Sequence, residues 1–219
     1  MSIIHPAEKH YTRENLFESI IESFKNQGIE NHAITREKLS SLDEFHVRGL
    51  QATLELIEES GITETSAVLD IGSGIGGPAR LLADKKKCHV TGIDITSEFV
   101  RTANLLSELV GLKDRTDFIK ADALDLPFDD NSFDVAWTQH VQMNIRDKEK
   151  LYTEIERVLN PDGRFIYYDI FTKSHEELTY PVPWANDNSI SFLMTPAALH
   201  ELLVNKGLTK VELKDHTKE

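Results

Sequence analysis

The sequence predicts an α/β fold: a doubly wound, mainly parallel sheet of the Rossmann-like kind, preceded by N-terminal helices. Two observations carry this prediction. From residue 66 onward, short runs rich in β-branched and aromatic residues alternate with amphipathic segments, and a glycine-rich turn joins the first run to the first of these segments. Parallel strands need crossover connections, so this alternation indicates helices on both faces of one sheet.

The individual elements follow from periodicity and from capping residues. Predicted strands cover residues 67–71, 89–95, 116–122, 133–139, 164–170 and 209–215. Predicted helices lie near residues 77–84, 97–110, 147–159 and 195–206.

The first 60 residues read as helices. Apolar residues at helical spacing predict one helix over 12–27, and a capping-box pattern at Ser41 predicts the start of another that ends near Gly61. We therefore divide the chain into an N-terminal helical cap, residues 1–65, and an α/β domain, residues 66–219.

The charge balance bears on the partners that the chain can bind. The net charge is −13 and the isoelectric point is about 5.1. An acidic chain repels phosphate backbones, so we expect no nucleic-acid partner. The one basic run, Lys85 to Lys87, is expected at a solvated helix end, where cations suit the helix dipole.

Other sequence features bear on compartment and metal content. A single cysteine, Cys88, suits a reducing compartment, and the N-terminus does not read as a signal peptide. No apolar run approaches the ~20 residues that cross a bilayer. The histidines show no metal-ligand spacing. We expect a cytoplasmic protein with no membrane partner and no metal, and leave open whether it forms a homo-oligomer.

The stretch "VLDIGSGIGGPARLLA", Val68 to Ala83, holds the most informative motif. Gly72, Gly74 and Gly77 satisfy the spacing G-x-G-x-x-G between a strand and a helix, which is the context of a nucleotide-binding turn. Glycines there allow positive φ angles and close approach of a ligand to the backbone. The spacing alone does not decide which ligand binds, because dinucleotide sites share it.

Acidic residues at the strand ends decide between the ligands. Asp70 would repel a pyrophosphate and would suit an ammonium group. Asp94 lies at the end of the second strand, where a carboxylate accepts hydrogen bonds from ribose hydroxyls. Asp122 and Ala123 end the third strand and could reach an adenine amine. A ligand with an adenosine, an amino acid end and no phosphate fits, as S-adenosylmethionine does.

Four segments in order, "VLDIGSGIGG", "VTGIDIT", "KADALDLPFDDNSFDVAWTQH" and "IERVLNPDGRF", resemble the successive motifs of the class I S-adenosylmethionine-dependent methyltransferases. "DEFHVRG" and "PVPWANDNSISFL" are similar to its small-molecule branch, the methyltransferase type 11 proteins that include sarcosine/dimethylglycine methyltransferases. The resemblance implies S-adenosylmethionine as cofactor and S-adenosylhomocysteine as product. The cofactor-binding residues expected from the loop, the strand ends and the resemblance are Asp70, Gly72, Gly74, Gly76, Asp94, Ile95, Asp122, Ala123 and Gln139.

The resemblance is incomplete at the C-terminus. Family sheets have seven strands, the last forming an antiparallel hairpin with the sixth, whereas this sequence ends at Glu219, just after the predicted sixth strand. We therefore expect the final antiparallel strand to be missing from the sheet.

The sequence offers fewer indications of which residues contact the methyl acceptor. His140 follows the fourth strand and is a candidate proton acceptor. His46, Tyr11, Trp184 and Met143 are expected to line the substrate pocket. Pro181 and Pro183 stiffen the long connector after the fifth strand, residues 171–194, which we expect to fold over the site. Further candidates are the aromatic faces of Trp137 and Tyr180 for a methylated cation, and Arg146 for a substrate carboxylate.

These observations predict an enzyme that methylates a small molecule, with an amine nitrogen slightly favoured over a ring carbon or a hydroxyl. Two alternatives remain open at this point. A nicotinamide-dependent oxidoreductase shares the sheet and a glycine loop, and a non-catalytic module could bind the cofactor and regulate a partner.

Overall fold

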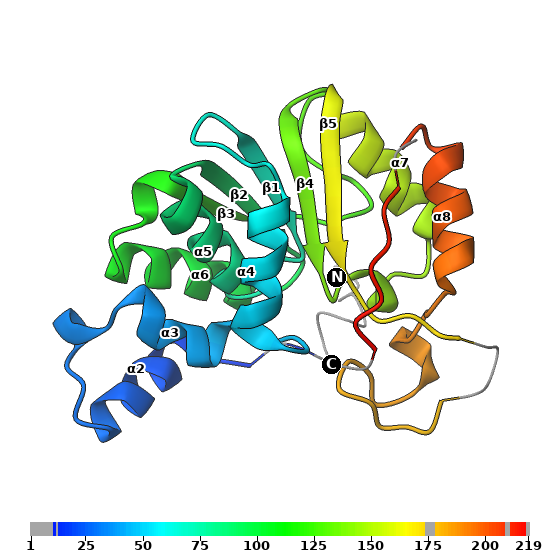
Figure 1. Cartoon of the computed structure of the whole chain (residues 1–219). Coiled ribbons are helices and arrows are strands. Elements are labelled where there is room, and N and C mark those ends of the chain that lie inside the picture. Colours follow the sequence, from blue (N-terminus) through cyan, green and yellow to red (C-terminus); the bar gives the residue numbers. More distant parts are fainter. Residues whose placement is uncertain (1–10, 12, 174–177, 209–210, 218–219) are drawn as a thin grey trace.

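A computed structural model describes residue 11 and residues 13–173, 178–208 and 211–217. It contains one sheet of five parallel strands in the order β3-β2-β1-β4-β5, which confirms the doubly wound α/β fold (Figure 1). The strands are β1 (Ala67–Ile71), β2 (His89–Asp94), β3 (Thr116–Lys120), β4 (Phe133–Gln139) and β5 (Leu159–Tyr168). The order reverses between β1 and β4, and in sheets of this kind ligands bind beyond the carboxyl ends at that point.

Helices cover both faces of the sheet. One face packs on α4 (Gly49–Glu59), α5 (Gly77–Lys86) and α6 (Ser97–Leu109), and the other packs on α7 (Lys148–Val158) and α8 (Pro196–Asn205). Strand side chains alternate between the two cores: Val68 and Trp137 belong to the first, and Leu69 and Ala136 to the second. Short 3-10 turns connect these elements: η1 (Asn31–Ala33), η2 (Lys113–Arg115), η3 (Gln142–Asn144) and η4 (Asn188–Ile190).

The N-terminal helices divide between two cores. Helices α2 (Leu16–Asn26) and α3 (Arg36–Asp43) pack against α6 around Phe24, Leu39 and Leu106, whereas α4 packs on the sheet through Ile57. The proposed division of the chain at residues 65/66 stays a prediction.

The expected helix start at Ser41 is wrong. Ser41 lies inside α3, where its hydroxyl donates to the carbonyl of Lys38, and the next helix begins only at Gly49. The chain leaves α3 after Asp43 because the Asp43 carboxylate accepts a hydrogen bond from Arg80, a fully buried residue of α5, at 2.7 Å. A long-range ion pair thus overrides the local capping pattern.

The predicted sixth strand is also wrong in its described part. Residues 211–215 form no strand, and residues 209–210 lie outside the described residues. The segment 211–217 instead runs back toward the carboxyl ends of the strands, where the His216 ring lies 6.4 Å from that of Tyr168 and 3.2 Å separate Arg48 Nη1 from His216 Nδ1 (Figure 1).

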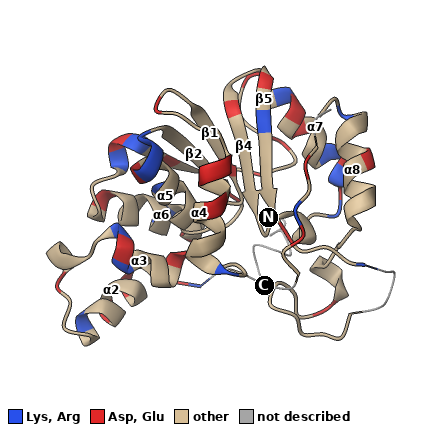
Figure 2. Ribbon diagram, viewed as in Figure 1, with Lys and Arg blue, Asp and Glu red and all other residues tan. Residues whose placement is uncertain are grey.

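Charged residues are distributed over helices, strands and loops (Figure 2), and Asp43, Asp70 and Arg80 are buried. Lys85 and Lys86 occupy the last turn of α5 and Lys87 its C-cap, as expected from the basic run. Among the described residues, no helix combines the length and the apolar character that crossing a membrane requires.

Candidate cofactor and acceptor site

The glycine loop joins β1 to α5 with three left-handed glycines. Gly72, Gly74 and Gly76 have φ angles of 71°, 54° and 84°, which side chains rarely tolerate. At Gly72 a Cβ atom would lie 2.5 Å from a methyl group of Val141, so the absence of a side chain also lets the loops after β1 and β4 pack together. The loop is fixed to β2 because the Gly74 N–H donates to Asp94 Oδ2 at 3.0 Å.

Asp70 lies directly beneath this loop. Its register partners are Gly92 on β2 and Trp137 on β4, so it occupies the central strand of the sheet, and the residue is only 2 % exposed. Burial, and secondarily the negative charges of Asp94 and Glu44, raise the pKa of Asp70 to about 8. Its Oδ2 atom makes no hydrogen bond within the described residues. A cationic ligand group would stabilise the ionised form of this enclosed acid, whereas an anionic group would make its ionisation still more costly, so the site favours a cation.

Asp94 ends β2 at the same edge. Its two oxygens accept hydrogen bonds from Gly74 N at 3.0 Å and Thr96 N at 2.8 Å. These two contacts orient the Asp94 carboxylate at the edge of the glycine loop. The adjacent Ile95 is half-buried.

Asp122 follows β3. One of its oxygens accepts from Leu124 N at 2.9 Å, and the side chain is exposed, while Ala123 packs at the edge of a core. The structure therefore places the predicted residues after β1 and β2 in direct contact, and places Asp122 in a local turn.

A buried polar cluster joins the segment before α4 to the end of β4. The Thr53 hydroxyl donates to Glu44 Oε2 at 2.7 Å, and His46 Nε2 lies 3.1 Å from the same oxygen. Gln139 Nε2 lies 3.2 Å from His46 Nε2, and its Oε1 accepts from the indole of Trp137 at 2.9 Å. The structure thus brings together the predicted residues His46 and Gln139.

His140, the next residue, has a left-handed backbone with φ 54°. Its ring stacks on Tyr168 at 5.6 Å and lies 5.8 Å from that of His46. Burial, and secondarily the charge of His46, lower the pKa of His140 to about 4, so the imidazole is neutral at pH 7. Strained residues of this kind persist where surrounding contacts hold them, often at functional sites.

Asp169 holds the turn that carries His140. Its Oδ2 atom accepts from the backbone N–H groups of Val141 and Gln142 at 3.1 and 3.0 Å, and its Oδ1 accepts from Ile170 N at 2.9 Å. Burial raises the pKa of Asp169 to about 6, although these three hydrogen bonds oppose the shift.

Residues 178–194 of the connector lie beside the turn that follows β4, below the arrowheads of β4 and β5 (Figure 1). Asn144 fixes it there: its side-chain amide donates to the carbonyls of Trp184 at 2.9 Å and Ile190 at 2.7 Å. The Tyr11 hydroxyl donates to Asn144 Oδ1 at 3.1 Å, so residue 11 meets the connector over the strand ends. Burial, followed by the charges of Asp94 and Asp169, raises the pKa of Tyr11 to about 12.

The other predicted acceptor residues differ in their exposure and in the contacts that they make. Trp137 is fully buried in the core, so the expectation that its face meets a cation is wrong. Arg146 stacks over the Phe192 ring, with its guanidinium carbon 4.7 Å from the ring centroid, and is thereby occupied within the connector. The Trp184 indole donates to Ser191 Oγ at 3.1 Å and is half-buried, and Met143 is 3 % exposed. Tyr180 is half-buried.

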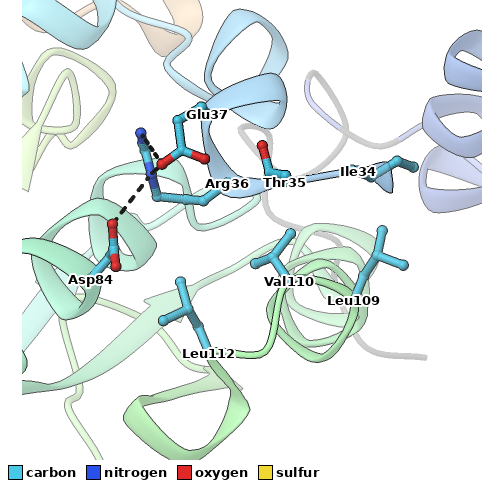
Figure 3. A pocket seen from close by; sticks show the side chains of 8 residues that line it. All are labelled: Ile34, Thr35, Arg36, Glu37, Asp84, Leu109, Val110 and Leu112. Carbon is cyan, nitrogen blue, oxygen red and sulfur yellow. Dashed lines mark hydrogen bonds and ion pairs between the residues drawn. The ribbon is translucent and has the colours of Figure 1, made fainter. Parts of the chain in front are cut away.

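A separate hollow of about 280 Å³ lies at the far ends of α5 and α6 (Figure 3). Its lining includes Arg36, Asp84 and Leu109, and Arg36 Nε lies 3.8 Å from Asp84 Oδ2. Because α5 and α6 run away from the strand ends, this hollow lies outside the candidate site. Among the described residues, no group of three or more histidine, cysteine or acidic side chains could hold a metal ion.

Sequence reasoning missed two residues of this site. Glu44 and Asn144 make some of its central contacts, and neither lies at a strand end. The signal for Glu44 was present in "DEFHVRG", where two acidic residues precede the predicted His46. No local pattern identifies Asn144, because its partners lie 40 and 46 residues away.

Comparison with known proteins agrees with this geometry. The "Methyltransferase domain" family matches residues 69–167. A sterol 24-C-methyltransferase, ERG6B, from Gibberella zeae is 39 % identical over 52 % of this chain and 30 % of its own length. A glycine/sarcosine/dimethylglycine N-methyltransferase from Actinopolyspora halophila is 28 % identical over 70 % of this chain and 27 % of its own length.

A solved structure of the [4+2]-cyclase SpnF covers 72 % of this chain and 56 % of that one, with a TM-score of 0.64 and 27 % identity. The chain spans less than a third of the length of the sterol methyltransferase and of the glycine/sarcosine/dimethylglycine methyltransferase. The matched domain, the sheet order and the glycine loop agree with one another. Residues 69–167 are thus similar to methyltransferase domains, in agreement with the sheet order of the structure.

Proposed function

We propose that the protein binds S-adenosylmethionine at the carboxyl ends of β1 and β2 and transfers its methyl group to a small molecule. The observation that carries the proposal is Asp70, a buried carboxylate with a free oxygen beneath the glycine loop. A nicotinamide dinucleotide would bring a pyrophosphate to this loop, which the carboxylate disfavours. An amino acid end brings an ammonium group, which it favours.

The other expected cofactor contacts follow from the strand ends. Gly72, Gly74 and Gly76 would face the amino acid end and Asp94 the ribose, as the fixed position of Asp94 beside the loop supports. Asp122 and Ala123 would face the adenine. Ile95 and Gln139 complete the set that we propose.

The cofactor supplies an activated methyl group, so the chain itself needs to orient the acceptor and exclude water. The connector and Tyr11, joined through Asn144, are suited to closing the site from solvent. We assign the acceptor wall to His46, Tyr11, Met143 and Trp184.

An amine is the acceptor that we favour. Glu44, Asp70, Asp94 and Asp169 make this end of the sheet acidic, which suits a cationic substrate. One relative is named for glycine, sarcosine and dimethylglycine, but another is named for sterol carbon methylation, and the fold also occurs in a protein named as a cyclase. Neither an oxidoreductase nor a regulatory module is favoured by these comparisons.

Methyl transfer can be tested with S-adenosylmethionine labelled in its methyl group. We expect label in at least one product when glycine, sarcosine, dimethylglycine, phenols and quinone-like compounds are offered, with an amine as the best acceptor. Turnover of only phenolic or quinone-like compounds would contradict the amine. Tight cofactor binding with no labelled product from any class would favour the non-catalytic alternative.

We propose His140 as the proton acceptor for a protonated or hydroxylic substrate, because its imidazole is already neutral at pH 7. Asparagine tolerates the left-handed backbone at this position and has no basic nitrogen. Replacing His140 by Asn is expected to slow turnover about 100-fold or more near pH 7, the usual range for loss of a general base.

The pH profile separates catalysis from positioning. If His140 takes the proton, the loss in the H140N variant shrinks as the pH approaches the acceptor's own pKa, where the acceptor ionises unaided. An equal loss at every pH from 6 to 9 would show that His140 only positions the substrate. Thermal unfolding of both proteins serves as the control for folding.

A further inference from the structure

Two carboxylate oxygens at the site are buried without hydrogen bonds within the described residues. They are Asp70 Oδ2 and Glu44 Oε1, and the hydroxyl of Ser73 in the glycine loop is also buried and unpartnered. Burying such an oxygen without a partner costs free energy, more when it is charged. The proposed cofactor accounts for Asp70, whereas Glu44 has no role so far.

Burial and two contacts to one of its oxygens fix Glu44. Its side chain is 1 % exposed, and its Oε2 atom is held by Thr53 at 2.7 Å and by His46 at 3.1 Å. These contacts use one oxygen and leave Oε1 free. The preceding residue, Asp43, packs against the first turn of α5, since a Cβ on Gly77 would lie 2.0 Å from the Asp43 carbonyl oxygen.

The segment that carries Glu44 therefore passes over the glycine loop. On its other side, His46 reaches Gln139 at the end of β4. Glu44 is also close enough to Asp70 for its charge to act on that carboxylate. Contacts through His46 and Gln139 lead from Glu44 to Trp137 on β4. Trp137 is the register partner of Asp70, so both free oxygens lie near the carboxyl ends of β1 and β4.

The chemistry of these two carboxylates selects the ligand group. Two carboxylates repel an anion, and a hydroxyl ligand offers one proton for two acceptors. An ammonium group has a positive charge and three N–H donors, which is enough for Asp70, Glu44 and one further acceptor.

We infer that Glu44 is a second acidic contact for a ligand ammonium group, which it binds together with Asp70 from the N-terminal side of the site. Under the proposed function, on which this inference rests, that group belongs to the amino acid end of the cofactor. An amine acceptor carries the same chemistry, so the experiment has to separate the two sources.

The test uses two ligands that differ in the amino acid end, which carries the ammonium group. S-adenosylhomocysteine has the amino acid end, and 5′-methylthioadenosine has the nucleoside and the sulfur without it. Their affinities are measured by calorimetry for the unmodified chain and for three variants, Glu44→Gln, Glu44→Asp and Glu55→Gln. Glu55 is a matched control, because its carboxylate contacts Arg48 and Gln51 on α4 and its loss changes the net charge equally.

Glu44→Gln is expected to lower the affinity for S-adenosylhomocysteine at least about tenfold, as for loss of a hydrogen bond to a charged group. The affinity for 5′-methylthioadenosine should change less than about twofold. Glu44→Asp keeps the charge on a shorter side chain. It should therefore lower the affinity for S-adenosylhomocysteine less than Glu44→Gln does. Glu55→Gln should change neither affinity.

Three results would overturn the inference. Unchanged binding of S-adenosylhomocysteine by both Glu44 variants would remove Glu44 from the contact, and if the KM of an amine acceptor rises instead, the ammonium group belongs to the acceptor. An equal loss for both ligands would mean that Glu44 shapes the site without binding the ammonium. Failure of the unmodified chain to bind either ligand would instead contradict the proposed function.

Discussion

Replacing Asp43 by alanine is expected to lower the free energy of unfolding by about 3–5 kcal/mol, the cost of removing one partner of a buried ion pair. The Arg80 side chain is 0 % exposed, and its Nη2 atom donates to Asp43 Oδ2 at 2.7 Å. The carbonyls of Ile75 and Ala103 and the hydroxyl of Ser107 accept its other hydrogen bonds, and none of them carries a charge to balance the guanidinium. The variant therefore leaves a buried cation without a counter-ion.

Urea unfolding of matched variants measures this effect. Glu37→Ala removes an exposed carboxylate that lies 3.4 Å from Arg36, and should change stability by less than about 1 kcal/mol. Adding Arg80→Met to Asp43→Ala removes the stranded charge and should recover most of the loss. A loss below about 1 kcal/mol for Asp43→Ala alone would show that the pair does not hold the N-terminal segment on α5.

Asp70→Asn is expected to stabilise the ligand-free protein above pH 8 and to lower its affinity for the ligand. Burial, Asp94 and Glu44 raise the pKa of Asp70 to about 8, far above that of an unfolded aspartate. The folded chain therefore holds a proton that the unfolded chain releases near pH 4. The stability that Asp70 contributes is present at low pH and is lost as the pH rises to about 8.

The asparagine variant has no such titration. Its melting temperature should exceed that of the unmodified chain at pH 8.5 by about 2–4 °C for each kcal/mol gained. Its affinity for S-adenosylhomocysteine should fall at least about tenfold, since the ammonium loses a charged partner. Asp162→Asn, an exposed aspartate, is the control for both measurements. Parallel pH profiles of stability for Asp70→Asn and the unmodified chain would contradict this account.

The cofactor side of the site could be predicted because its determinants are local. A strand, a glycine turn and a helix follow one another within 68–83, so Asp70 and the three glycines are recognisable from their order alone. Asp94 follows from the rule that ligands meet the carboxyl ends of parallel strands. The structure adds that Asp94 also holds the loop through the N–H of Gly74.

The acceptor side could not be predicted equally well, because distant contacts determine it. The position of Asn144 depends on hydrogen bonds with Tyr11, Trp184 and Ile190. The position of Glu44 depends on its hydrogen bond with Thr53 and on the packing of its segment against α5. The sequence also fails to predict that Trp137 is fully buried, for a related reason. An alternating strand pattern places it on a face, but only the packed helices show that this face is completely covered.

The two failed elements show the same limit. Ser41 has a good capping pattern, yet the Asp43–Arg80 pair ends α3 two residues later and delays the next helix. Residues 211–215 have strand-like alternation but no strand partner in the described sheet, where β5 is the last strand. In both cases tertiary contacts, and not local propensity, determine the secondary structure.

The central claim is that the glycine loop and its acidic residues hold S-adenosylmethionine. The most direct test is calorimetric titration of the intact chain with S-adenosylhomocysteine and, separately, with NADH, which presents a pyrophosphate to the same loop. We predict saturable binding of S-adenosylhomocysteine at one site and no heat of binding for NADH. Binding of NADH without S-adenosylhomocysteine, or of neither ligand, would contradict the account.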